Sequence, residues 1–109
     1  MDFEITPNEL QQKLNAGEAP VIIDVRDAVE LQIASLKGAE VKHMPMADVP
    51  ARAHQELDPD DHIVVVCHHG VRSANVVMWL RGQGFDRAQS MRGGIDQWSK
   101  TVDPSVPTY

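Results

Sequence analysis

The residues best suited to chemistry lie in one short segment around the only cysteine of the chain. The segment reads Cys67-His68-His69-Gly70-Val71-Arg72-Ser73. It begins at the end of one of the two longest apolar runs of the sequence, Ile63 to Cys67, and leads directly into a helical pattern. Binding sites in open α/β sheets gather beyond the carboxyl ends of strands. We therefore expect Cys67 to lie at such a site.

The types of residue in this segment predict a reactive thiolate. A short turn before a helix points several backbone N–H groups toward one spot and adds the positive end of the helix dipole. Thiols in such surroundings ionise more readily than a free cysteine. Gly70 lets the loop curl around the sulfur, and Arg72 can hold an anionic substrate through paired hydrogen bonds. The backbone amides from His68 to Ser73 are the expected donors to the sulfur of Cys67.

Other interpretations of the same residues stay open. A single cysteine at the end of a buried strand is often an inert core residue. Arg72 could pair with a nearby carboxylate instead of substrate, and His68 and His69 could contact substrate, tune the thiol or be solvent-exposed loop residues. A metal site at Cys67, His68 and His69 is not expected, because we expect adjacent side chains in a loop to diverge.

The elements that must position this loop alternate between strands and helices. Val21–Val25 and His62–Cys67 are β-branched runs of the kind that is buried on both faces of a sheet. Weaker strand candidates are Phe3–Ile5, the segment near Glu40–Lys42, and Ala88–Met91. This alternation predicts an α/β sandwich around a mainly parallel sheet.

Capping residues and apolar spacing predict the helices between the strands. The first begins after Thr6, in a capping-box pattern, and ends by Gly17. Further helices are expected from about Pro50 to Leu57, from Ser73 to Gln83 and from Asp96 to Lys100. Because no linker or repeat interrupts these elements, we expect one domain over residues 1–109.

Composition limits the classes of partner. Sixteen acidic against ten basic residues give a net charge of −6 at pH 7, and no basic patch is visible, so nucleic acid and anionic lipid are not expected partners. The longest apolar run is too short to cross a membrane, and the acidic start of the chain lacks the pattern of a signal peptide. We therefore expect a cytoplasmic protein.

The motif Cys67-x-x-Gly70-x-Arg72-Ser73 after a Val-rich strand resembles the active-site loop of rhodanese-like sulfurtransferases. Further stretches are similar to that family in the expected order: Ile23–Arg26 with Glu30 and then Gly38–Ala39, Arg92–Trp98, and Val102–Tyr109. The resemblance implies a three-layer sandwich with a mainly parallel five-stranded sheet flanked by helices. It also implies that Cys67 is catalytic and that the loop from His68 to Ser73 binds substrate.

Outside the loop, Asp24 and Arg26 end the neighbouring strand, and we expect them to support the loop rather than to react. Two departures from the family stand out. Ala34-Ser35-Leu36 stands where many members have Gly-His-Ile, which we interpret as local repacking. His68 and His69 stand where thiosulfate-using members often have Arg or Lys, and because histidine is only partly charged near neutrality, the donor stays open.

In that family, the resemblance implies, a cysteine thiolate takes the outer sulfur of a donor such as thiosulfate. The persulfide then passes its sulfur to cyanide, a thiol or another protein, and no metal or organic cofactor is required. The alternatives are a non-enzymatic persulfide carrier or regulatory module and, less favoured, a cysteine phosphatase or arsenate reductase. Loops of those enzymes place the arginine one position further from the cysteine than Arg72 is from Cys67, and the shorter loop here suits a sulfur atom better than a phosphate.

Overall fold

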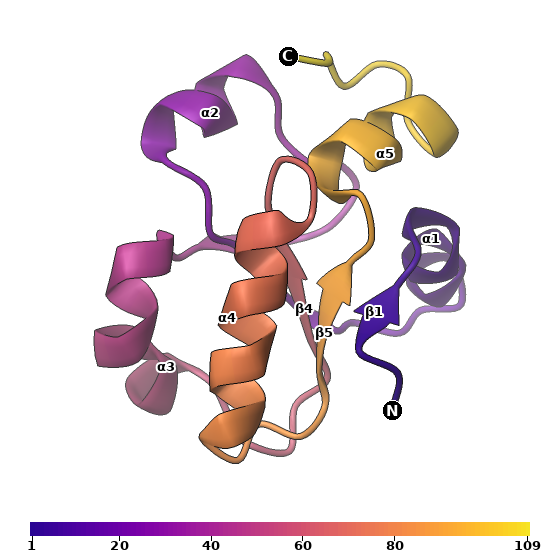
Figure 1. Cartoon of the computed structure of the whole chain (residues 1–109). Coiled ribbons are helices and arrows are strands. Elements are labelled where there is room, and N and C mark those ends of the chain that lie inside the picture. Colours follow the sequence, from indigo (N-terminus) through magenta and orange to yellow (C-terminus); the bar gives the residue numbers. More distant parts are fainter.

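A five-stranded parallel sheet runs through the centre of the computed structural model, which describes residues 1–109 (Figure 1). The strands are β1 (Glu4–Ile5), β2 (Val21–Asp24), β3 (Val41–His43), β4 (Ile63–Val66) and β5 (Ala88–Met91). Their order across the sheet is β1-β5-β4-β2-β3, and every neighbouring pair is parallel. The predicted architecture is therefore confirmed.

The two strands next to the candidate loop lie at the middle of the sheet because their side chains are apolar on both faces. All four residues of β4 are buried, and only Val21 of β2 is partly exposed. In the register of the sheet, Asp24 pairs with Val66 of β4 on one side and with His43 of β3 on the other. This alignment brings the segments that leave β2 and β4 together at one edge of the sheet.

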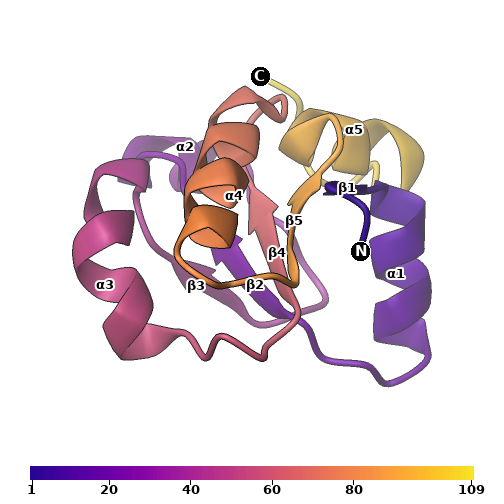
Figure 2. The ribbon, with the colours of Figure 1, turned by 60° about the horizontal axis from the view of Figure 1, so that its bottom comes forward.

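Helices cover both faces of the sheet and complete the three layers (Figure 2). They are α1 (Pro7–Asn15), α2 (Ala28–Ile33), α3 (Val49–Glu56), α4 (Val71–Gly82) and α5 (Gly94–Thr101), with a 3-10 turn η1 (Met46–Asp48) before α3. The four predicted helices are present, and the last two begin two residues earlier than expected. Helix α2 was not predicted, although Asp27 and Glu30 form a capping box at its start.

Alternation along the strands divides the core into two clusters. Ile23 and Val65 pack on the side of α3 and α4, whereas Ile22 and Val64 pack on the side of α1 and α5. Each cluster fixes one of the helices that begin at the carboxyl edge of the sheet, α4 on one face and α5 on the other. At this edge, the top of Figure 1, the starts of α4 and α5 meet α2 and the C-terminal segment.

The lengths and hydropathies of the helices bear on membrane insertion. None of them combines the length with the apolar character that a transmembrane span requires.

Candidate active site

The sulfur of Cys67 lies at the N-terminal end of α4, directly after β4. Its Sγ accepts hydrogen bonds from the backbone N–H groups of Gly70 at 3.1 Å and Ser73 at 3.3 Å. Gly70, with φ +98°, is the residue before the helix and turns the chain into it. Two amides and the positive end of α4 therefore face the sulfur, an arrangement that stabilises negative charge on it.

Two buried hydroxyl groups extend this environment. Sγ of Cys67 lies 3.3 Å from Oγ of Ser73, which lies 2.7 Å from Oγ of Ser90 on β5. If the Ser90 hydroxyl donates to Ser73, the Ser73 hydroxyl can donate to a sulfur anion. The pair can therefore stabilise the thiolate form of Cys67. Ser73 belongs to the predicted loop, but Ser90 was missed because only the strand order places β5 beside β4.

The start of α5 supports the loop from behind. The N–H groups of Ile95 and Asp96 donate to the carbonyl oxygens of Cys67 (2.8 Å) and His68 (3.1 Å). Gly94 has φ +61°, and a Cβ atom there would collide with these same two carbonyl groups. The close approach of this glycine to the loop appears only in the folded chain.

Arg72 is held by a carboxylate. Its Nη1 and Nη2 donate to Oε2 and Oε1 of Glu30 at 2.8 and 2.9 Å. These bonds are the main reason why the pKa of Glu30 falls to about 2, and in return the pKa of Arg72 is raised. One of the two interpretations of Arg72, pairing with a carboxylate, is thus present in the structure, and its binding of a substrate anion stays a prediction. Glu30 was part of the sequence motif, but no role had been predicted for it.

Asp24 and Arg26 form a buried ion pair under the site. Nη2 of Arg26 lies 2.7 Å from Oδ2 of Asp24, and Arg26 is fully buried. The guanidinium also donates to the carbonyl of Ala34 and to the hydroxyl of Tyr109, each at 2.8 Å. Because these partners follow α2 and end the chain, the ion pair ties both segments to β2. Its support of the loop stays a prediction.

The two histidines of the loop lie side by side at its surface. The ring centroids of His68 and His69 lie 3.7 Å apart. Tyr109 stacks on the other face of His68, with ring centroids 3.7 Å apart and an angle of 3° between the ring planes. The expectation that these neighbouring side chains diverge is therefore wrong, because the chain bends at both residues. Burial, and then the proximity of His69, lower the pKa of His68 and favour its neutral form.

Tyr109 was noted in the sequence only as part of a C-terminal resemblance. Its hydroxyl donates to Oε1 of Glu30 at 3.0 Å. No local signal could assign this contact, since 79 residues separate the two partners.

This geometry, a cysteine at the start of a helix beyond a central parallel strand, agrees with the outcome of comparison with known proteins. The family model of the rhodanese-like domain matches residues 6–101. The chain belongs to the rhodanese family.

Individual relatives support the assignment. The thiosulfate sulfurtransferase GlpE of Glaesserella parasuis is 33% identical over 101 residues, which cover 93% of this rhodanese and 90% of that protein. The probable adenylyltransferase/sulfurtransferase MoeZ of Mycobacterium tuberculosis is 34% identical over 105 residues, 96% of this chain. The crystal structure of a rhodanese-like domain protein from Staphylococcus aureus superposes with a TM-score of 0.82 at 29% identity and covers 99% of both chains.

The relatives differ in length. This rhodanese spans 34% of the first curated relative and 26% of MoeZ. Because the chain covers so small a part of these relatives, their sulfurtransferase activity is a proposal for this chain.

Proposed function

We propose that this rhodanese moves a sulfane sulfur through a persulfide on Cys67, from a donor such as thiosulfate to a thiophilic acceptor. The observation that carries the proposal is the pair of N–H groups, from Gly70 and Ser73, that converge on Sγ at the start of α4. The acceptor is cyanide, a thiol or a protein. No metal or organic cofactor enters the transfer itself.

The chemistry needs two displacements at sulfur. The thiolate of Cys67 attacks the outer sulfur of thiosulfate, a new S–S bond forms, and sulfite leaves with the electron pair of the old one. The acceptor then attacks the outer sulfur of the persulfide, and the Cys67 thiolate leaves in its turn. Each step creates or releases a sulfur anion, so donors fixed before the reaction lower both barriers.

The loop offers further donors for the outer sulfur of a persulfide. Val71 and Arg72 supply the first two N–H groups of α4, which have no carbonyl partner within the helix. The hydroxyl of Ser73 lies 3.3 Å from Sγ of Cys67. We assign to these groups the stabilisation of the terminal sulfur anion. We place His68 and His69 at the entrance to the sulfur-binding site.

The same site gives an argument about the donor. Thiosulfate is a dianion, but the guanidinium of Arg72 is already paired with Glu30. Arg72 therefore binds a donor anion only by sharing or leaving that carboxylate. This favours a second candidate function, a persulfide carrier that is loaded by another protein, and relatives such as MoeZ suggest that sulfur transfer involves protein partners.

Intact-mass spectrometry tests the proposal. The purified protein is incubated with thiosulfate, with mercaptopyruvate, or with a cysteine desulfurase and cysteine, beside a Cys67→Ser variant. We expect a gain of one sulfur atom with at least one donor and none in the variant. Loading by the desulfurase alone would favour the persulfide carrier over the thiosulfate enzyme. A cytoplasmic location is part of the same proposal. Absence of any gain with all three donors would refute the persulfide.

Two controls separate the remaining alternatives. Arg72→Ala should lower kcat/KM for thiosulfate more than loading by a protein donor, because only the anion needs the guanidinium. Hydrolysis of a generic aryl phosphate should stay far slower than sulfur transfer. Phosphate release that outpaces sulfur transfer would assign the loop to the phosphatases instead.

A further inference from the structure

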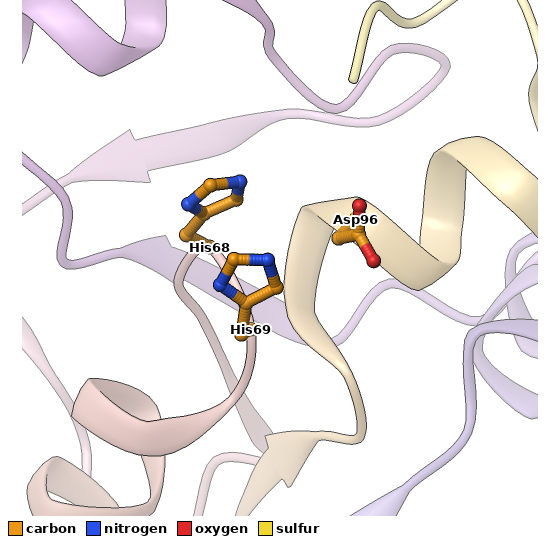
Figure 3. Close-up of side chains that lie close together, drawn as sticks. All are labelled: His68, His69 and Asp96. Atoms are coloured by element: carbon orange, nitrogen blue, oxygen red, sulfur yellow. The ribbon is translucent and has the colours of Figure 1, made fainter. Parts of the chain in front are cut away.

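A second group of side chains with ligand chemistry lies beside the sulfur-carrying loop. His68 and His69 from the loop and Asp96 from α5 each place one ligand atom within 4.8 Å of the others (Figure 3). The backbone fixes this arrangement, because the N–H group of Asp96 donates to the carbonyl of His68 at 3.1 Å. The sulfur-transfer chemistry leaves the carboxylate of Asp96 without a role.

The donor set has a definite preference. Two imidazoles and one carboxylate suit Zn²⁺ and its neighbours Cu²⁺ and Ni²⁺, whereas Mg²⁺ and Ca²⁺ prefer sites made of oxygen alone. Three protein ligands also leave a coordination position for water or another ligand. The composition of the cluster therefore predicts a transition metal rather than an alkaline-earth ion.

An unpartnered atom points the same way. Nε2 of His68 is buried and has no hydrogen-bond partner. A buried polar atom without a partner carries a desolvation cost, which a bound ion or an ordered water removes. The ring of His68 is half-buried and lies between His69 and the ring of Tyr109.

We propose that His68, His69 and Asp96 bind a divalent transition metal ion such as Zn²⁺. Ligand atoms around a tetrahedral zinc ion lie roughly 3.3 Å apart, so the side chains must close on the ion. His69 is exposed, so its ring has room to turn toward the ion. Asp96 is paired with Lys100 on the next turn of α5 at 3.0 Å, so the lysine competes with the metal for this carboxylate.

The test uses the full chain in a Cys67→Ser background, which removes the thiolate as an alternative ligand. Tag-free, chelator-treated protein is titrated with Zn²⁺ and with Mg²⁺ in a calorimeter. We expect one Zn²⁺ per chain and no Mg²⁺ binding. His69→Ala and Asp96→Asn should each weaken Zn²⁺ binding at least ~10-fold, since metal affinity depends on every ligand.

Two further variants in the same background keep the proposal falsifiable if a ligand variant folds poorly. Lys100→Gln should tighten Zn²⁺ binding several-fold by freeing Asp96. His54→Ala removes an exposed histidine on α3 and should leave binding unchanged. The proposal is overturned by no Zn²⁺ uptake in the parent, by parental affinity in Asp96→Asn or Lys100→Gln, or by an equal loss in His54→Ala. Because Cys67 is absent throughout, failure here leaves the persulfide proposal untouched.

Discussion

The ion pair between Arg72 and Glu30 makes a quantitative prediction about stability. It joins α4 to α2 through two hydrogen bonds, and the side chain of Glu30 is only 16% exposed. The pKa of Glu30 falls from 4.5 to about 2, chiefly because of Arg72. At about 1.4 kcal/mol for each unit of pKa, this corresponds to about 3 kcal/mol. Solvent at the edge of the pair reduces the expected contribution to about 1–3 kcal/mol.

Glu30→Gln tests this magnitude because it removes the charge and keeps the shape. The amide oxygen can still accept the N–H group of Asp27, as the carboxylate does at 3.0 Å. We expect the free energy of unfolding at pH 7 to fall by about 1–3 kcal/mol. The pKa of Glu30 is lower in the folded than in the unfolded state. The stability that the wild type gains over Glu30→Gln is therefore complete above about pH 4.5 and is lost as the pH falls toward about 2.

Urea unfolding followed by tryptophan fluorescence from pH 7 to pH 3 measures both effects. The deficit of Glu30→Gln should shrink over the acidic part of this range. Glu56→Gln is the matched control, because Glu56 pairs with Arg52 within α3 and with Lys42 of β3 at more exposed positions, and such pairs contribute little. The reasoning is wrong if the deficit of Glu30→Gln is independent of pH or no larger than that of Glu56→Gln.

Three more predictions concern the support of the loop. Stability is measured by urea unfolding for the two that concern it, and the rate of sulfur transfer is measured for the third. Gly94→Ala should lower the free energy of unfolding by at least about 2 kcal/mol more than Gly84→Ala. Both glycines have positive φ, but only Gly94 of the two faces backbone carbonyl groups. Equal losses of stability would contradict this. Ser90→Ala should slow sulfur transfer about 5-fold through a lost hydrogen bond of about 1 kcal/mol, and an unchanged rate would remove the hydroxyl pair from the mechanism. Arg26→Met should cost about 3–5 kcal/mol by leaving Asp24 buried and unpaired; a loss below about 1 kcal/mol would refute that.

Local sequence signals predicted the strands, most of the helices and the loop. The capping box of Thr6 and Glu9 forms as its spacing indicates. The apolar runs became the central strands β2 and β4, since residues buried on both faces leave little choice of position. Helix α2 escaped prediction because none of its residues is buried, so it lacks the apolar periodicity of the other helices.

What the sequence alone determined is the chemistry of the loop: a cysteine, a glycine that turns the chain and the start of a helix are neighbours in the chain. Only the tertiary structure decided which distant groups face that loop. Ser90 reaches Ser73, and Glu30 reaches Arg72, across 17 and 42 residues. The strand order and the packing of α2 bring these partners together. Such contacts have no periodicity or spacing of their own, because they depend on where whole elements pack and not on the residues beside them in the chain.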